Sequence, residues 1–268
     1  MSGAGQWSDL AARVASALVM LVVGLAAVAA GGHVFHVFAA VLCGVMIWEL
    51  VRMVSVTNQD QDQPGLAAGL GAIAGVSAMA AIYLPAGLGL PVLFLPALAG
   101  LAKLTEGRRV FITYAMLIML AGFGLMGVRD DFGLLWMLWL VAVVVVTDVA
   151  GYFAGRLIGG PKFWPRVSPK KTWSGTVAGW VGAAVVAFVF MMQTGADASL
   201  IGMSVSVAMA SQLGDIAESA IKRRSDVKDS SALIPGHGGV LDRFDGMLGA
   251  SAFLLVAGPI VGFPPVGM

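Results

Sequence analysis

In the C-terminal half of this sequence, carboxylates lie in or beside long apolar runs, namely Asp148, Asp215, Glu218, Asp242 and Asp245. An ionised side chain in hydrocarbon is costly, so such residues usually face the protein interior and serve a function. Oxygen ligands without cysteine suit a hard cation such as Mg²⁺, which binds one or two carboxylates and leaves positions for substrate phosphates. Asp215 and Asp242 are therefore predicted to bind a divalent cation.

Helical spacing places one group of polar residues on a single stripe, because residues three, four and seven apart share a helix face. The stripe contains Ser211, Gln212, Asp215, Glu218, Ser219 and Lys222. The rest of that segment is mostly apolar, so the stripe is expected to face the interior of a helix bundle.

Simpler interpretations of the carboxylates stay open. Glu218 and Lys222 also have the spacing of a plain i,i+4 ion pair. Asp242 also suits the cap of a helix, with Asp245 in its first turn. Asp148 alone also suits a hydrogen bond between packed helices.

Two loops add cations and glycines to these carboxylates. The run SPKKTWSGT, residues 168–176, places two lysines directly before a predicted helix. The first N–H groups of a helix, with lysines beside them, form a favourable binding site for phosphate. The run PGHGG, residues 235–239, predicts a tight turn, because glycine permits positive φ and close approach to a ligand. His237 in this turn either contacts a phosphate or fills a polar loop. Together the residues predict a site for a phosphorylated substrate, such as a lipid phosphate, at a membrane interface.

The elements that position these residues are expected to be membrane helices. The chain is 59% hydrophobic and 12% charged, and several apolar runs reach the roughly 20 residues that a crossing helix needs. The single cysteine, Cys43, excludes a disulfide framework. We predict an all-α polytopic membrane protein with about nine transmembrane helices, the first of them retained rather than cleaved as a signal peptide. The expected spans are 11–30, 34–51, 65–84, 87–102, 110–127, 133–154, 175–193, 199–220 and 244–262.

Charge in the loops predicts the orientation, because Lys and Arg accumulate on the cytoplasmic side. Nine spans place fifteen of the sixteen Lys and Arg residues on the side of the N-terminus, and only Arg129 opposite. The N-terminus is therefore expected in the cytoplasm and the C-terminus outside. We divide the chain into N-terminal helices without a catalytic motif, 1–130, and a C-terminal catalytic region, 131–268. This region carries two basic cytoplasmic loops, 155–174 and 221–243.

The longest motif resembles the signature of the phosphatidate cytidylyltransferases, also called CDP-diacylglycerol synthases. It reads SAIKR, four residues, KD and then SSALIPGHGGVLDRFD, from Ser219 to Asp245. The helix SQLGDIAESAIKR before it, and DVAGYFAGR with SPKKTW further upstream, resemble other blocks of that family. One departure is Ser174, which stands where the family pattern has Glu.

The resemblance implies transfer of a cytidylyl group from CTP to phosphatidate, giving CDP-diacylglycerol and pyrophosphate. It implies Mg²⁺, a second cation such as K⁺, and a homodimer in the inner (plasma) membrane with its site on the cytoplasmic side. A net charge of +1 gives no indication of a nucleic-acid partner.

By position, Asp215, Asp242 and Asp245 match the metal-binding aspartates, and Lys222 and Arg223 complete the expected catalytic set. The residues expected to bind the nucleotide are Asp148, Ser168, Lys170, Lys171, Thr172, Lys228, Asp229, His237, Gly238, Gly239 and Arg243. Alternatives are a cytidylyltransferase or CTP-dependent kinase for another lipid acceptor, and a membrane transporter.

Overall fold

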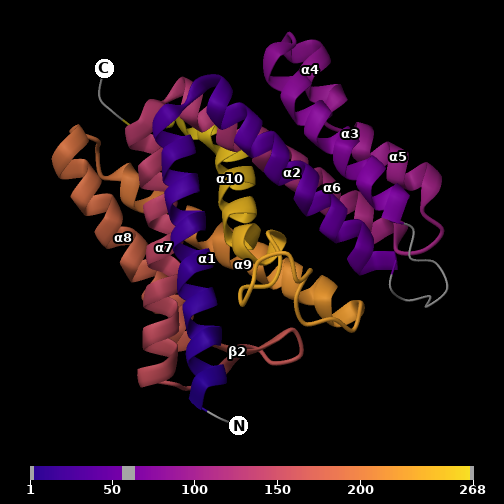
Figure 1. The fold of residues 1–268 in the computed structure, drawn as a ribbon. Coiled ribbons are helices and arrows are strands. Elements are labelled where there is room, and N and C mark those ends of the chain that lie inside the picture. The colour runs from indigo at the N-terminus through magenta and orange to yellow at the C-terminus, as the bar shows by residue number, and fades with distance from the viewer. Residues whose placement is uncertain (1–2, 56–63, 266–268) are drawn as a thin grey trace. The chain divides into compact units, whose positions relative to one another are not determined.

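The computed structural model describes residues 3–55 and 64–265, and helices dominate this range (Figure 1). Its helices are α1 (Gly3–Ala30), α2 (Gly32–Ser55), α3 (Pro64–Tyr83), α4 (Ala86–Val92), α5 (Leu95–Lys103), α6 (Arg108–Asp131), α7 (Gly133–Leu157), α8 (Trp173–Thr194), α9 (Ser199–Arg224) and α10 (Leu241–Val261). Two short strands, β1 (Lys162–Trp164) and β2 (Ser168–Thr172), lie between α7 and α8. Eight helices of the described range are long and apolar enough to cross a membrane. The chain is a multi-pass helical membrane protein, as its composition predicts.

The chain forms two compact units. The N-terminal unit contains Met1–Met126 together with Arg224–Phe244, and the C-terminal unit contains Gly127–Arg223 together with Asp245–Met268. The second basic loop thus belongs with the N-terminal helices, although both flanking helices lie mainly in the C-terminal unit.

In the N-terminal unit, α2 and α3 pack closely and antiparallel through small residues. A Cβ on Gly44 would lie 2.9 Å from the Gly71 carbonyl oxygen, and a Cβ on Gly71 would lie 2.7 Å from the Gly44 oxygen. Small residues permit this close approach, which replaces hydrophobic burial as the packing force between helices in lipid.

The fourth predicted span, 87–102, is two short helices rather than one. The ring of Pro96, at the start of α5, would clash with the carbonyl of residue 92, where α4 ends. Gly89 of α4 packs against the end of α3 near Ala81, and Gly100 of α5 packs against Phe111 at the start of α6. The broken pair therefore returns the chain from one end of α3 to the other, as an unbroken helix would (Figure 1).

In the C-terminal unit, helices α7 to α10 pack through glycines and a few buried polar contacts. A Cβ on Gly175 of α8 would lie 2.5 Å from the Gly151 carbonyl oxygen of α7. The buried indole of Trp139 donates to Ser204 Oγ at 3.0 Å and ties α7 to α9. The outward face of α8 is apolar, since Val181 and Val185 are each 59% exposed. That face suits contact with lipid.

The first basic loop, predicted as 155–174, contains an antiparallel hairpin of β1 and β2. Helix α7 continues to Leu157 before the hairpin begins. Phe163 packs on Trp173 with ring centroids 4.7 Å apart. The hairpin places Lys170 and Lys171 directly before the start of α8.

Candidate active site

A pocket of about 450 Å³ opens in the C-terminal unit between α7, β2, α8 and α9. Five residues expected to bind nucleotide or metal line it, namely Asp148, Lys170, Lys171, Thr172 and Asp215. The remaining lining residues are Thr147, Gly151, Tyr152, Gly155, Arg156, Gly175, Thr176 and Gln212. Motifs more than 60 residues apart in the sequence thus meet at one cavity.

Two residues that line this pocket form an ion pair. Lys171 Nζ lies 2.5 Å from Asp215 Oδ2, with the two side chains 26% and 29% exposed. Ser219 Oγ donates to the other Asp215 oxygen at 3.2 Å. Because both charged groups remain accessible, an incoming anion can reach Lys171 and an incoming cation can reach Asp215.

The start of α8 is fixed by side chains of the preceding strand. Thr172 is the N-cap, and its hydroxyl accepts a hydrogen bond from the Gly175 N–H at 3.2 Å. Ser174 Oγ hydrogen-bonds to the Thr172 hydroxyl at 3.0 Å and donates to the Gly159 carbonyl. The helix start that the sequence predicts beside Lys170 and Lys171 is therefore present.

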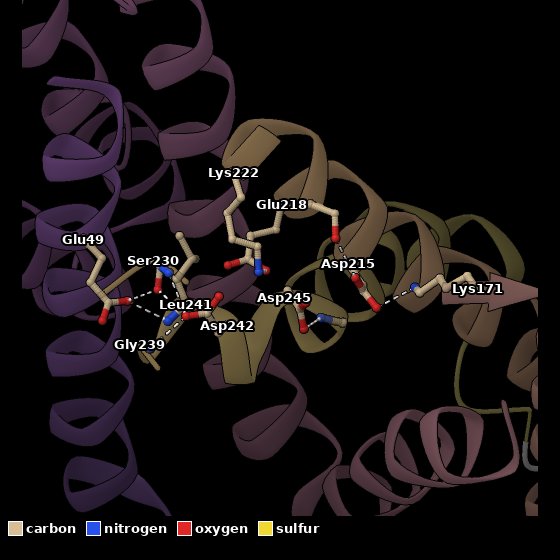
Figure 2. A network of polar contacts seen from close by, with 12 residues as sticks. Glu49, Lys171, Asp215, Glu218, Lys222, Ser230, Gly239, Leu241, Asp242 and Asp245 are labelled. Carbon is tan, nitrogen blue, oxygen red and sulfur yellow. Dashed lines mark hydrogen bonds and ion pairs between the residues drawn. The ribbon is translucent and has the colours of Figure 1, made fainter. Parts of the chain in front are cut away.

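Further carboxylates lie along α9 and α10 of the same unit. Lys222 Nζ donates to Glu218 Oε2 at 2.9 Å, so the predicted i,i+4 ion pair is confirmed, and the Glu218 side chain is fully buried. Asp245 Oδ1 accepts from the Gly246 N–H at 2.7 Å (Figure 2). Asp245 is also an electrostatic neighbour of Asp215. Negative charge is thus concentrated beside the pocket.

Asp242 lies in the N-terminal unit and organises the second basic loop. Its Oδ2 accepts three hydrogen bonds at 2.8 Å, from the N–H and the hydroxyl of Ser230 and from the Gly239 N–H. Helix α10 begins at Leu241, so Asp242 stands inside its first turn. These three bonds connect Asp242 to the loop. A simple helix cap would instead accept hydrogen bonds from the first N–H groups of the helix.

The PGHGG run forms the tight turn that its glycines predict. Gly236 and Gly238 have φ of 73° and 80°. The Ile234 N–H donates to the Gly238 carbonyl at 2.8 Å and closes the turn. His237 Nδ1 is hydrogen-bonded to Ser16 Oγ of α1 at 2.8 Å. The imidazole thus packs against the first helix of its own unit.

The remaining predicted site residues make fewer contacts. Ser168 lies in β2, half-buried and paired with Trp164 of the hairpin. The others are exposed, namely Arg223, Lys228, Asp229 and Arg243. Among the residues that the structure describes, His, Cys, Asp and Glu side chains form no group of three or more with metal-binding geometry.

A family model described as the cytidylyltransferase family matches residues 11–260. The chain belongs to the cytidylyltransferase family. A phosphatidate cytidylyltransferase of Staphylococcus saprophyticus is 32% identical over 253 residues, which cover 88% of this chain and 94% of that relative.

Other relatives in this family match over shorter regions. A phosphatidate cytidylyltransferase of Brucella suis is 45% identical over 141 residues, 51% of this chain and 52% of the relative. One from Bacillus subtilis is 41% identical over 128 residues, 47% of this chain and 48% of the relative. In these two cases the match spans about half the length of the relative.

The sequence analysis did not predict a role for one buried polar residue, Glu49. Glu49 of α2 is fully buried, and its carboxylate accepts hydrogen bonds from the second basic loop. A signal was present, because Glu49 is the only charged residue in the predicted span 34–51. The rule that singled out Asp148 applies equally to Glu49.

Proposed function

We propose that this protein transfers a cytidylyl group from CTP to phosphatidate, giving CDP-diacylglycerol and pyrophosphate in phospholipid biosynthesis. The observation that carries the proposal is the pocket that brings Lys170, Lys171, Asp148 and Asp215 together at the start of α8. The family and the names of the relatives supply the reaction class.

The cations of the pocket suit a triphosphate. Lys170, Lys171 and Arg156 line one cavity beside a helix N-terminus, and both features attract phosphate. Because two polyanions must approach each other, this positive charge lowers the electrostatic barrier between CTP and the lipid phosphate.

The residues present fit Mg²⁺. Asp215 and Asp245 offer carboxylate oxygens in the C-terminal unit, and the family resemblance adds Asp242. Asp215 is accessible at 29% exposure. A preformed cluster of three ligands is unnecessary, since Mg²⁺ commonly binds one or two carboxylates together with substrate phosphates. When bound, Mg²⁺ supplies neutralisation of the charge that develops on the transferring phosphoryl group. A second cation such as K⁺ belongs to the same proposal.

The reaction is an in-line displacement. A phosphate oxygen of phosphatidate forms a bond to the α-phosphorus of CTP, and the bond from that phosphorus to the oxygen bridging to the β-phosphorus breaks. Pyrophosphate leaves with the electron pair. No general base is required, because a phosphomonoester with a second pKa of about 6 is largely a dianion at neutral pH. The protein's part is to hold and orient the two phosphates.

The proposed setting is the inner (plasma) membrane, with the pocket on the cytoplasmic side and the C-terminus outside. The positive charge of the loops supports this orientation if the α4–α5 pair counts as one crossing in addition to the eight long helices of the described residues. Two copies of the chain are proposed to form a homodimer, which size-exclusion chromatography with light scattering would test.

The proposal is tested with purified protein in detergent, phosphatidate, CTP and Mg²⁺. Pyrophosphate release and CDP-lipid formation are followed for the native protein, Asp215→Asn and Asp242→Asn. Asp226→Asn is the matched control, because Asp226 is an exposed loop residue at φ 54° where asparagine fits. We expect both products from the native protein and the control, and neither from the two folded site variants.

Other outcomes identify the alternatives. Formation of CDP instead of pyrophosphate with a polyprenol acceptor would indicate a CTP-dependent kinase. Pyrophosphate release with a different lipid phosphate, but not with phosphatidate, would show that the other lipid phosphate is the acceptor. A protein inert towards all of these acceptors, but able to move a labelled solute into proteoliposomes without CTP, would be a transporter.

A further inference from the structure

The carboxylate of Glu49 is fully satisfied by one segment of the N-terminal unit (Figure 2). Its Oε1 accepts from Ser231 Oγ at 2.6 Å and from the Val240 N–H at 2.9 Å. Its Oε2 accepts from the Leu241 N–H at 2.7 Å and from Ser230 Oγ at 3.3 Å. Each oxygen therefore accepts from one backbone N–H and faces one hydroxyl, and the single Ser230 hydroxyl proton is shared with Asp242 Oδ2, which lies closer at 2.8 Å.

The two backbone donors lie at the beginning of α10. The Val240 carbonyl already accepts from the N–H groups of Arg243 and Phe244, so Val240 is the capping position. The first N–H groups of a helix have no acceptor within the helix, and a negative charge there is favourable. Glu49 supplies that acceptor and charge from α2. It thereby fixes the residue at which α10 starts.

Asp242 depends on the same segment. Its Oδ2 is held by Ser230 and by the Gly239 N–H. Ser230 Oγ reaches both carboxylates, at 2.8 Å to Asp242 and 3.3 Å to Glu49. A Cβ on Gly239 would lie 2.5 Å from Glu49 Oε1 and 2.0 Å from Ser230 Oγ, so the packing leaves no space there.

We propose that Glu49 is a positioning residue for Asp242 in the cytidylyl transfer. It holds the 230–241 segment and the first turn of α10, and through them it sets the direction of the Asp242 carboxylate toward the cation. This inference rests on the proposed function, because that function assigns the cation to Asp242. In this role Glu49 acts only through its hydrogen bonds to Ser230, Ser231, Val240 and Leu241.

Glu49→Gln perturbs the network directly. In either orientation, the glutamine NH₂ group faces one backbone N–H, Val240 or Leu241, and cannot accept from it. Glu106→Gln is the matched control, because it removes the same charge from an exposed loop of the same unit. Gly239→Ala perturbs the network from the opposite side and leaves the carboxylate in place. Its control is Gly69→Ala, where a Cβ meets nothing within 4 Å.

Two measurements test this inference without relying on catalytic activity. Amide hydrogen exchange of a peptide spanning 230–244 reports whether the Val240 and Leu241 N–H groups lose their acceptor. Titration with Mn²⁺ alone, followed by electron paramagnetic resonance, reports metal affinity. We expect faster exchange in Glu49→Gln and Gly239→Ala. We also expect Mn²⁺ binding to weaken about 10- to 100-fold, the usual effect of removing a residue that orients a ligand. Both controls should match the native protein.

Unchanged exchange in the 230–244 peptide would overturn the inference, because the network would then be absent in solution. Faster exchange with native Mn²⁺ affinity would also overturn it, since Glu49 would then only anchor a loop. If Glu49→Gln fails to fold, Gly239→Ala decides by the same criteria. A native protein that binds Mn²⁺ but forms no CDP-diacylglycerol would reject the proposed function, and the Mn²⁺ comparison would still test the role of Glu49.

Discussion

Replacing Gly214 of α9 by alanine should disturb both stability and activity of the C-terminal unit. A Cβ at this position would lie 2.3 Å from the Asp245 carbonyl oxygen and 3.0 Å from the Gly249 nitrogen of α10. Both obstacles are backbone atoms, so no side-chain rotation relieves the clash. Helix α10 must move, and Asp245 moves with it.

The size of the effect follows from this geometry. Ordinary van der Waals contact begins at 3.4 Å, so the added Cβ would lie about 1.1 Å too close to the Asp245 carbonyl oxygen. Overpacking of this kind costs about 1–3 kcal/mol, which corresponds to a fall in Tm of about 2–10 °C for a chain of this size. A misplacement of about 1 Å at reacting groups costs about 10²-fold in rate, so kcat should fall by that order.

The assay compares Gly214→Ala with Gly202→Ala on the same helix. A Cβ at Gly202 meets nothing within 4 Å, so that variant should be unchanged or more stable by up to about 1 kcal/mol. Thermal unfolding in detergent and CDP-lipid formation are measured for both. Equal Tm and equal kcat in the two variants would refute the close packing of α9 on α10 and the need for Asp245 at its present position.

Three further outcomes are expected. Lys171→Met removes the cation 2.5 Å from Asp215 and should raise the KM for CTP about tenfold, the effect of one lost charge-assisted contact; an unchanged KM in steady-state kinetics would contradict this role. Thr172→Ala removes the N-cap of α8 and should cost about 1 kcal/mol in thermal unfolding, whereas Thr172→Ser should retain that stability. His237→Ala removes one of the contacts between the 235–239 turn and Ser16, and it should lower turnover without changing the pH dependence of kcat; abolished turnover with CTP binding and folding intact would show that a general base is needed after all.

The sequence predicts local features of this protein better than contacts between residues that are far apart in the chain. The i,i+4 ion pair of Glu218 and Lys222 and the glycine turn at 235–239 follow from spacing and residue type alone. The pairing of Lys171 with Asp215 does not, because it depends on how a hairpin and α9 come together. The sequence predicts a role for both charged residues, but not their contact.

The broken fourth span shows a second limit. Apolar length predicts a crossing at 87–102, and the α4–α5 pair does traverse its unit. The break itself comes from Pro96, whose ring ends the preceding helix four residues earlier. Proline is tolerated in many membrane helices, because neighbouring groups satisfy the freed carbonyls. Residue type alone therefore does not decide between a kink and a break.

The contacts of Glu49 set an order of events during synthesis. Its hydrogen-bond donors follow it by 181 to 192 residues in the chain. At about 5–20 residues per second, the ribosome needs about 10–40 s to add them. For that interval α2 carries a carboxylate whose final partners do not yet exist. The N-terminal unit is therefore completed only when residues 230–241 have been made, long after its first helices, and the C-terminal unit follows with Asp245–Met268.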